Sequence, residues 1–266
     1  MQANETTISG LEDDLALIRD AAREGGEIAM RHFKRDPETW YKNGTSPVSE
    51  ADIAVDDFLR RTLRAARPGY GWLSEETVDS PERLSARRTF VVDPIDGTRA
   101  FLEGRSTWCV SIAVVEDGAP LVGVLDCPAK REIYEATAAG APTLNGAALG
   151  VAAPRETPRV AGPKPMLERA PAWMRAGPRV PYIPSLAYRI AMVASGEIDA
   201  TFVKPNSHDW DLAAADLILR RAGGAVLDAG GMPLSYAGPQ PRHGALAAGS
   251  GALLRDMAQV IAAMEP

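Results

Sequence analysis

Apolar residues recur with a helical period in the early part of the chain. Residues three, four or seven positions apart define one face: Leu11, Leu15, Ile18, Ala22 and Ala29. This spacing predicts an amphipathic helix over residues 11–34. A second helix is expected to begin near Ser49, because Asp52 follows three residues later and an apolar-periodic run continues to Leu63.

Strand-forming runs follow in the first half of the chain. The predicted strands lie at residues 40–42, 70–73, 89–93, 108–115, 120–127 and 133–136, with a loop at 43–47. Asp117-Gly118 separates two of these runs and is typical of a β-hairpin turn. We therefore expect residues 1–140 to form an α+β half with an antiparallel sheet.

The pattern changes after residue 185, where helical and extended segments alternate. Helices are predicted at residues 185–195, 211–222 and 251–263, and strands at 200–203, 225–227 and 245–248. Such alternation is typical of an α/β arrangement, so residues 141–266 are expected to form an α/β half. The segment 154–184 is rich in proline and weakly periodic, and it predicts no definite element.

Composition and charge narrow the possible functions. The chain has 266 residues and a net charge of −6, and its arginine pairs are too short to form a long basic run. A negative protein without such a run is a poor partner for a nucleic-acid backbone. The two cysteines, Cys109 and Cys127, lie in apolar stretches and are expected to be reduced and buried. The three histidines form no zinc pattern.

The first residues of the sequence are not those expected of a secretory signal. The first residues are polar and lack the basic and then apolar order of a secretory signal, and no 18-residue apolar run exists. We therefore expect a cytoplasmic protein without a membrane partner.

The stretch Asp93-Pro94-Ile95-Asp96-Gly97-Thr98 carries the most specific chemistry. Pro94 favours an extended Asp93, so a strand should end there and a turn should bring the two carboxylates together. Gly97 has no Cβ, and the helix start behind it leaves N–H groups free. Two acids beside free N–H donors fit a site shared by a divalent metal and a phosphate.

Spacing separates this interpretation from its competitors. An EF-hand loop counted from Asp93 would need a Glu at its twelfth position, where Gly104 stands. An aspartyl-phosphate enzyme is expected to have its two acids two apart, whereas these are three apart. An ordinary Asx/Gly turn after a strand stays open on this stretch alone.

Three further acids stand where predicted elements begin or end. Glu75 follows a strand, and Asp52 and Asp211 lie in the first turns of predicted helices. The helix dipole alone favours acids at helix starts, so Asp52 and Asp211 each have an ordinary explanation. Together with Asp93 and Asp96 they would repel one another unless two or more Mg²⁺ ions were bound.

These motifs together resemble the inositol monophosphatase family of Mg²⁺-dependent, lithium-sensitive phosphatases. The resemblance rests on Asp93–Thr98, on Glu75-Glu76 upstream, and on Trp210-Asp211 and Ala222-Gly223-Gly224 downstream. It implies the layered αβαβα sandwich shared with fructose-1,6-bisphosphatases, and a homodimer. It also implies hydrolysis of a small phosphate monoester by direct attack of water, with two or three Mg²⁺ ions per site.

The resemblance assigns roles to individual residues. Glu75, Asp93 and the Ile95 carbonyl would hold a first Mg²⁺, and Asp93, Asp96 and Asp211 a second, with Glu75 helping a weaker third. Thr98 and Glu75 would orient the attacking water, while Asp52 bonds to Thr98. The N–H groups of Gly97 and Thr98 would bind phosphate oxygens.

The substrate depends on less specific residues. The segment Ser46–Asp52 resembles the corresponding segment of 3'(2'),5'-bisphosphate nucleotidases. Lys204 stands where inositol phosphatases typically carry a Glu, and a cation there suits a second anionic group. The expected substrate contacts are therefore Lys204, Ser185 and Arg189, and 3'-phosphoadenosine 5'-phosphate is favoured slightly over inositol monophosphate. An ordinary solvent-facing loop position for Lys204 stays open, as do histidinol phosphate and sugar phosphates as substrates. His208 and Asp209, just before Trp210, are further candidates for the pocket lining.

Two non-enzymatic alternatives come from different functional classes. Some family members act as regulatory proteins that bind RNA or a transcription complex, against which the acidic balance counts. A pseudophosphatase scaffold would be expected to have lost part of its site, yet Glu75, Asp93, Asp96, Thr98 and Asp211 are all present. A gel shift with RNA and Mg²⁺-dependent phosphate release would separate these alternatives from an enzyme.

Overall fold

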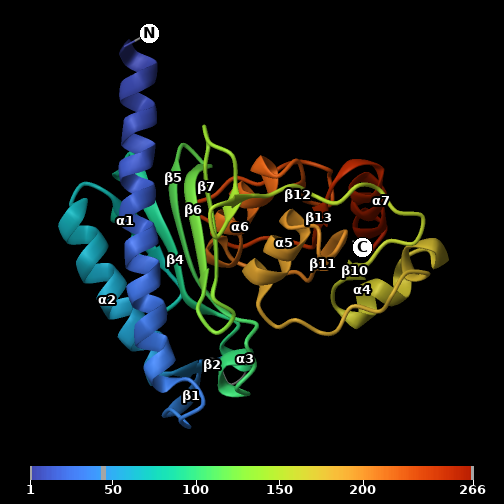
Figure 1. The fold of residues 1–266 in the computed structure, drawn as a ribbon, viewed down its shortest axis with the longest axis horizontal. Coiled ribbons are helices and arrows are strands. Elements are labelled where there is room, and N and C mark those ends of the chain that lie inside the picture. Colours follow the sequence, from blue (N-terminus) through green and yellow to red (C-terminus); the bar gives the residue numbers. More distant parts are fainter. Residues whose placement is uncertain (1, 43–45, 265–266) are drawn as a thin grey trace.

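Two long helices cover the outer face of the first sheet in the computed structural model, which describes residues 2–42 and 46–264 (Figure 1). These helices are α1 (Gln2–His32) and α2 (Glu50–Ala66). A small antiparallel pair, β1 (Thr39–Lys42) and β2 (Ser46–Ser49), connects them. At the start of α2 a capping box between Ser49 and Asp52 satisfies backbone donors, as the sequence predicts. Ser46 and Pro47, expected in a loop, lie in β2 instead, and residues 43–45 fall outside the described part.

The first sheet has seven strands in chain order. They are β3 (Gly71–Ser74), β4 (Arg88–Asp96), β5 (Cys109–Glu116), β6 (Ala119–Cys127), β7 (Glu132–Thr137), β8 (Thr143–Leu144) and β9 (Ala147–Ala148). All neighbours are antiparallel except β3 and β4, which are parallel and are linked through a short 3₁₀ helix at Pro81–Ser85. The sheet therefore continues to Ala148, beyond the expected division at residue 140. Asp117 and Gly118 form the predicted hairpin turn, both with positive φ.

The second half forms the remaining layers, in which helices lie on both faces of a mixed sheet. The four strands, in spatial order, are β10 (Val160–Ala161), β11 (Ala200–Val203), β13 (Leu246–Gly249) and β12 (Ala225–Leu227). Two helices lie between the sheets, α5 (Leu186–Ala194) and α6 (Asp209–Arg221). The outer helices are α4 (Lys164–Arg169) and α7 (Gly251–Ala262), with a 3₁₀ turn at Ala172–Arg175. Short elements thus occupy the proline-rich segment for which the sequence predicts none.

Three apolar clusters hold the layers together and confirm the αβαβα order (Figure 1). One joins α1 and α2 to the first sheet, the largest surrounds α5 and α6, and the third lies beneath α7. Gly123 of β6 allows α6 to approach closely, since an added Cβ would lie 3.0 Å from the Ala214 backbone. None of the described helices is both long and apolar enough to cross a membrane.

One buried acid lies between α1 and the first sheet. Asp126 on β6 faces Gly26 of α1, where an added Cβ would lie 2.1 Å from the carboxylate. Burial raises the pKa of Asp126 to about 7, although the charge of Arg23 opposes this shift. Because the folded pKa exceeds the unfolded value, this group lowers stability progressively as pH rises from about 4 to 7.

We therefore expect Asp126→Asn to remove this pH dependence. Relative to wild type, the variant should gain about 1–2 kcal/mol in unfolding free energy between pH 5.5 and pH 8. Urea unfolding at the two pH values measures the difference, and exposed Asp57, changed to Asn, is the control. An equal pH dependence in variant and wild type would contradict the expectation.

Candidate active site

The strand β4 carries the first two acids of the site. Asp93 pairs with Ser111 and Asp96 with Cys109, and the register shifts between these pairs. The backbone N–H of Ile95 donates to the Asp93 carboxylate at 3.0 Å. The expected turn after Asp93 is therefore a β-bulge inside a strand that ends at Asp96.

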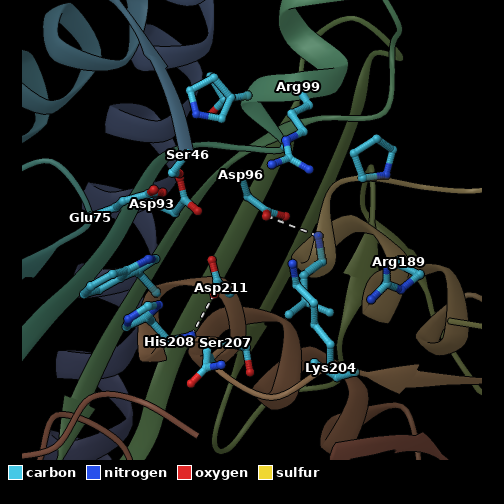
Figure 2. A pocket seen from close by; sticks show the side chains of 18 of the residues that line it. Ser46, Glu75, Asp93, Asp96, Arg99, Arg189, Lys204, Ser207, His208 and Asp211 are labelled. Carbon is cyan, nitrogen blue, oxygen red and sulfur yellow. Dashed lines mark hydrogen bonds between the residues drawn. The ribbon is translucent and has the colours of Figure 1, made fainter. Parts of the chain in front are cut away.

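Glu75, Asp93 and Asp211 converge on one point (Figure 2). One carboxylate oxygen from each lies within 4.8 Å of the others. The parallel pairing of β3 and β4 brings Glu75 beside Asp93, and the Glu75 N–H donates to the Val92 carbonyl at 3.3 Å. Asp211 lies in the first turn of α6, where its side chain accepts the His208 N–H at 2.7 Å. Three of the predicted metal ligands, from three elements, thus share one place.

The electrostatics of this cluster favour a bound cation. Burial raises the pKa of Asp93 well above its usual range, and the charges of Glu75 and Asp96 raise it further. Burial also raises the pKa of Glu75 well above its usual range, with Asp211 and Glu76 adding to the effect. Burial raises the pKa of Asp211 to about 7, assisted by the charge of Asp96. A hard divalent cation with oxygen ligands would offset both repulsion and desolvation, so the residues fit Mg²⁺.

Asp96 lies apart from this cluster. Its carboxylate accepts the backbone N–H groups of Leu186 at 3.1 Å and Ala187 at 2.7 Å, and the hydroxyl of Ser185. Burial raises its pKa, and these three bonds oppose the rise. Asp96 thereby satisfies free donors at the start of α5. It still lines the same cavity, and its role as a metal ligand stays a prediction.

Gly97 packs closely against Ser185 of the same protein. Gly97 has φ of +95° at the start of the short helix α3 (Thr98–Leu102), and an added Cβ would lie 2.9 Å from Ser185 Cβ. Ser185 is fully buried and is absent from the cavity wall. The expectation that Ser185 contacts substrate is therefore corrected: its hydroxyl serves Asp96 and the start of α5.

Thr98 and Asp52 form the hydrogen-bonded pair that the resemblance implies. Thr98 Oγ1 lies 3.1 Å from Asp52 Oδ1 and 3.1 Å from the Ile95 carbonyl oxygen. The other Asp52 oxygen accepts the N–H of Ser49 at 2.8 Å and its hydroxyl at 2.6 Å. Burial raises the pKa of Asp52, and the Ser49 bonds counteract the rise.

A cavity of about 500 Å³ opens in front of these groups. Lys204 is exposed and extends into it, and Arg99 lies on its opposite side (Figure 2). Arg189 also borders the cavity but is 7% exposed, and it donates to Thr201 and the Ile183 carbonyl, both at 2.9 Å. Arg189 therefore anchors α5 with two of its donors, and a role in binding substrate stays a prediction.

Sequence reasoning missed several residues of the cavity wall. Arg99 follows Thr98 in the first turn of α3, a position that could have suggested it. Tyr182 comes from the proline-rich segment, whose pattern gives no signal. Of the two candidates just before Trp210, His208 lines the cavity and stacks on Trp210 with ring centres 4.5 Å apart, whereas Asp209 is absent from the cavity wall and accepts hydrogen bonds from His243 and the Ala237 N–H.

Comparison with known proteins agrees with this geometry. A model of the inositol monophosphatase family matches residues 11–263. The chain belongs to the inositol monophosphatase family. Family relatives include a histidinol-phosphatase of Mycobacterium tuberculosis, 33% identical over 92% of this chain and 95% of that protein. An inositol-1-monophosphatase of Mesorhizobium japonicum is 33% identical over 82% of this chain and 86% of that protein.

Solved structures of the family show the same fold. The extragenic suppressor protein SuhB of Bartonella henselae has a TM-score of 0.81 at 25% identity, over 94% of this chain and 98% of that chain. The inositol monophosphatase of Thermotoga maritima has a TM-score of 0.83 at 24% identity, over 94% of this chain and 97% of that chain. The layered fold expected for the family is thus confirmed.

We expect Asp211→Asn to stabilise the metal-free protein at pH 8. The wild-type carboxyl has a pKa raised from about 4 to about 7, so its burial lowers stability progressively as pH rises across that range, and the loss is complete at pH 8. The gain in unfolding free energy should be on the order of 1 kcal/mol at pH 8 and smaller at pH 5.5.

Thermal unfolding with and without Mg²⁺ completes the measurement. Wild type should gain stability as Mg²⁺ is added, because a ligand of the folded state stabilises it, and the variant should not. A variant that is less stable than wild type at pH 8 without metal would show that repulsion in the cluster is unimportant.

Proposed function

We propose that the chain is a Mg²⁺-dependent phosphomonoesterase. The observation that carries the proposal is the convergence of Glu75, Asp93 and Asp211 in one cavity with the Thr98–Asp52 pair. Membership of a phosphatase family supports phosphate ester hydrolysis as the reaction. A divalent cation is proposed because it would offset the repulsion among the buried acids. Bound Mg²⁺ would make a water easier to deprotonate and would neutralise charge on the phosphate and the leaving oxygen.

The protein groups then position the reactants. Asp52 accepts the Thr98 hydrogen, which leaves lone pairs of Thr98 Oγ1 free to accept a hydrogen from the attacking water. Glu75 accepts the other hydrogen and so fixes the direction of attack. The N–H groups of Gly97 and Thr98 bind phosphate oxygens at the start of α3. Asp96 and the Ile95 carbonyl complete the expected ligand set.

The substrate that best fits the cavity carries a second anionic group. Lys204 and Arg99 provide positive charge in the wall. Among the described lining residues, every acid belongs to the metal cluster or is Asp96, so none is left over for ring hydroxyls or an amine. We therefore favour a bisphosphate nucleotide such as 3'-phosphoadenosine 5'-phosphate.

An adjoining cavity of about 590 Å³ supports the same choice. It shares Tyr182 with the active-site cavity and is lined by three cationic residues, Lys164, Arg175 and Arg179. The described lining contains no acid and includes apolar side chains such as Met174. Cations beside an aromatic ring suit the phosphate and base of a nucleotide.

Histidinol phosphate and inositol 1-phosphate are the other candidates. The Mycobacterium tuberculosis relative named histidinol-phosphatase aligns with almost the whole chain, and the Mesorhizobium japonicum relative is named for inositol 1-phosphate. The alternative of a regulatory RNA-binding protein has a relative in the Nus factor SuhB of Xylella fastidiosa, 32% identical over 78% of this chain. On α2, Arg60, Arg61 and Arg64 line a surface hollow, and Asp57 in the same lining offsets part of their charge. A homodimer and a cytoplasmic location stay expectations.

The substrate choice is tested by phosphate release with Mg²⁺ from a panel. The panel holds 3'-phosphoadenosine 5'-phosphate, inositol 1-phosphate, histidinol phosphate and fructose 1,6-bisphosphate. We expect kcat/KM for the nucleotide to exceed the others tenfold or more, about 1.4 kcal/mol in the transition state. Lys204→Ala should raise KM for the nucleotide about tenfold and leave inositol 1-phosphate nearly unchanged. Preference for histidinol phosphate would instead support the relative's activity.

The role of Thr98 is tested separately from metal binding. We expect Thr98→Val to lower kcat by about 10²-fold or more, because the water loses its acceptor, with Mg²⁺ affinity retained. Thr98→Ser keeps the hydroxyl and should retain most activity. Equal activity of the Val and Ser variants would exclude a role for the hydroxyl.

A further inference from the structure

Helix α2 carries two buried carboxylates one turn apart. Asp52 and Asp56 are separated by four residues, so they lie on the same face of the helix. They are 1% and 5% exposed. Asp52 bonds Thr98, whereas Asp56 plays no part in the proposed reaction and contacts none of the reacting groups. A second buried acid beside the site therefore needs its own explanation.

Asp56 binds both ends of the segment that carries Glu75. The Ser74 hydroxyl donates to Asp56 Oδ1 at 2.5 Å, and the Thr77 hydroxyl donates to Asp56 Oδ2 at 2.7 Å. Ser74 is the last residue of β3, and Thr77 lies three residues later, in the bend that follows the strand. The Asp56 carboxylate thus links the two ends of the loop Ser74-Glu75-Glu76-Thr77.

The two hydroxyls are themselves held by further bonds. Trp72 Nε1 donates to Thr77 Oγ1 at 3.3 Å, and the Glu76 N–H approaches Ser74 Oγ at 3.4 Å. Since each hydroxyl already accepts from these donors, its own hydrogen is directed to Asp56. An uncharged amide at position 56 would offer one acceptor oxygen in place of two, so one of the two hydroxyls would lose the acceptor for its own hydrogen.

The Glu75 side chain depends on this loop for its position. Within the described part of the chain, no hydrogen bond to its carboxylate is formed. Its backbone is fixed on two sides, because its N–H donates to Val92 at 3.3 Å and its carbonyl accepts Lys42 Nζ at 3.2 Å. The Asp56 bonds fix the loop on the third side, towards α2.

We propose that Asp56 is a positioning residue that sets the place of Glu75 relative to Thr98. Through Asp52 and Asp56, the rigid helix α2 is tied to both the water-orienting hydroxyl and the loop of a metal ligand. The proposal rests on the proposed function, since it assumes that Glu75 binds Mg²⁺. Groups that orient metal ligands typically change metal affinity 10–100-fold when altered.

The test compares Asp56→Asn with Asp14→Asn. Asp14 is also a buried acid, 1% exposed and on α1, and it accepts hydrogen bonds from Tyr70, Arg67 and Arg88, none of which lines the active-site cavity. Both changes should lower the unfolding temperature. Only Asp56→Asn should weaken Mg²⁺ binding, by about tenfold or more in calorimetric titration.

Kinetics provide a readout that a purely structural role would not move. The activity of Asp56→Asn should recover at high Mg²⁺, and KM for the phosphate ester at saturating Mg²⁺ should match wild type. Thr77→Val and Ser74→Ala each remove one of the two bonds and should give smaller losses of affinity in the same direction. If Asp56→Asn does not fold, the Mg²⁺ affinities of these two variants test the positioning role of Asp56.

The outcomes separate this proposal from the proposed function. Wild type without Mg²⁺ binding would overturn the proposed function and this inference with it. Wild type that binds Mg²⁺, with Asp56→Asn and Thr77→Val of unchanged affinity, would overturn this inference alone. A loss of affinity in Asp14→Asn equal to that in Asp56→Asn would also overturn it, because general destabilisation would then account for both.

Discussion

Repulsion among Glu75, Asp93 and Asp211 is the interaction on which the arrangement of this molecule depends. Burying three acids together is costly in any fold, and here it occurs where β3, β4 and the start of α6 meet. The surrounding layers hold the acids in place: the first sheet fixes two of them, and the packing of α6 between the sheets fixes the third. The large apolar core contributes stability that offsets the cost of burying these acids.

Hydrogen bonds around the cluster divide the acids into two kinds. Glu75, Asp93 and Asp211 place oxygens close to one another, whereas the oxygens of Asp52, Asp56 and Asp96 accept hydrogen bonds from hydroxyl groups of other segments. Each of the latter binds a hydroxyl from another element: Thr98, Ser74 with Thr77, and Ser185. The three clustered carboxylates are thus surrounded by three others that are hydrogen-bonded to hydroxyl groups.

Most elements and the acids of the site could be predicted from the sequence, because both depend on local signals. Helical periods, the Asp117-Gly118 turn and the Asp-Pro-Ile-Asp-Gly-Thr stretch need no knowledge of distant contacts. The errors arose where distant groups decide the outcome. Ser185 turns inward because Asp96 accepts its hydroxyl hydrogen, and strand β4 continues past Pro94 because β5 supplies a partner for Asp96. The role of Asp56 depends on a loop 18 or more residues away, which no local pattern reveals.

The order of the chain has a consequence for biosynthesis. The first sheet is complete at Ala148, and with α1 and α2 it can bury one face while synthesis continues. Its other face, which bears Glu75 and Asp93, has no cover until α5 and α6 emerge. During that interval the two acids face water, where ionised carboxylates are well solvated. The repulsion with Asp211 is therefore added only when α6 brings that residue beside the first two acids. A cation held by all three acids would therefore bind after α6 had packed on the first sheet, and it would stabilise that packing.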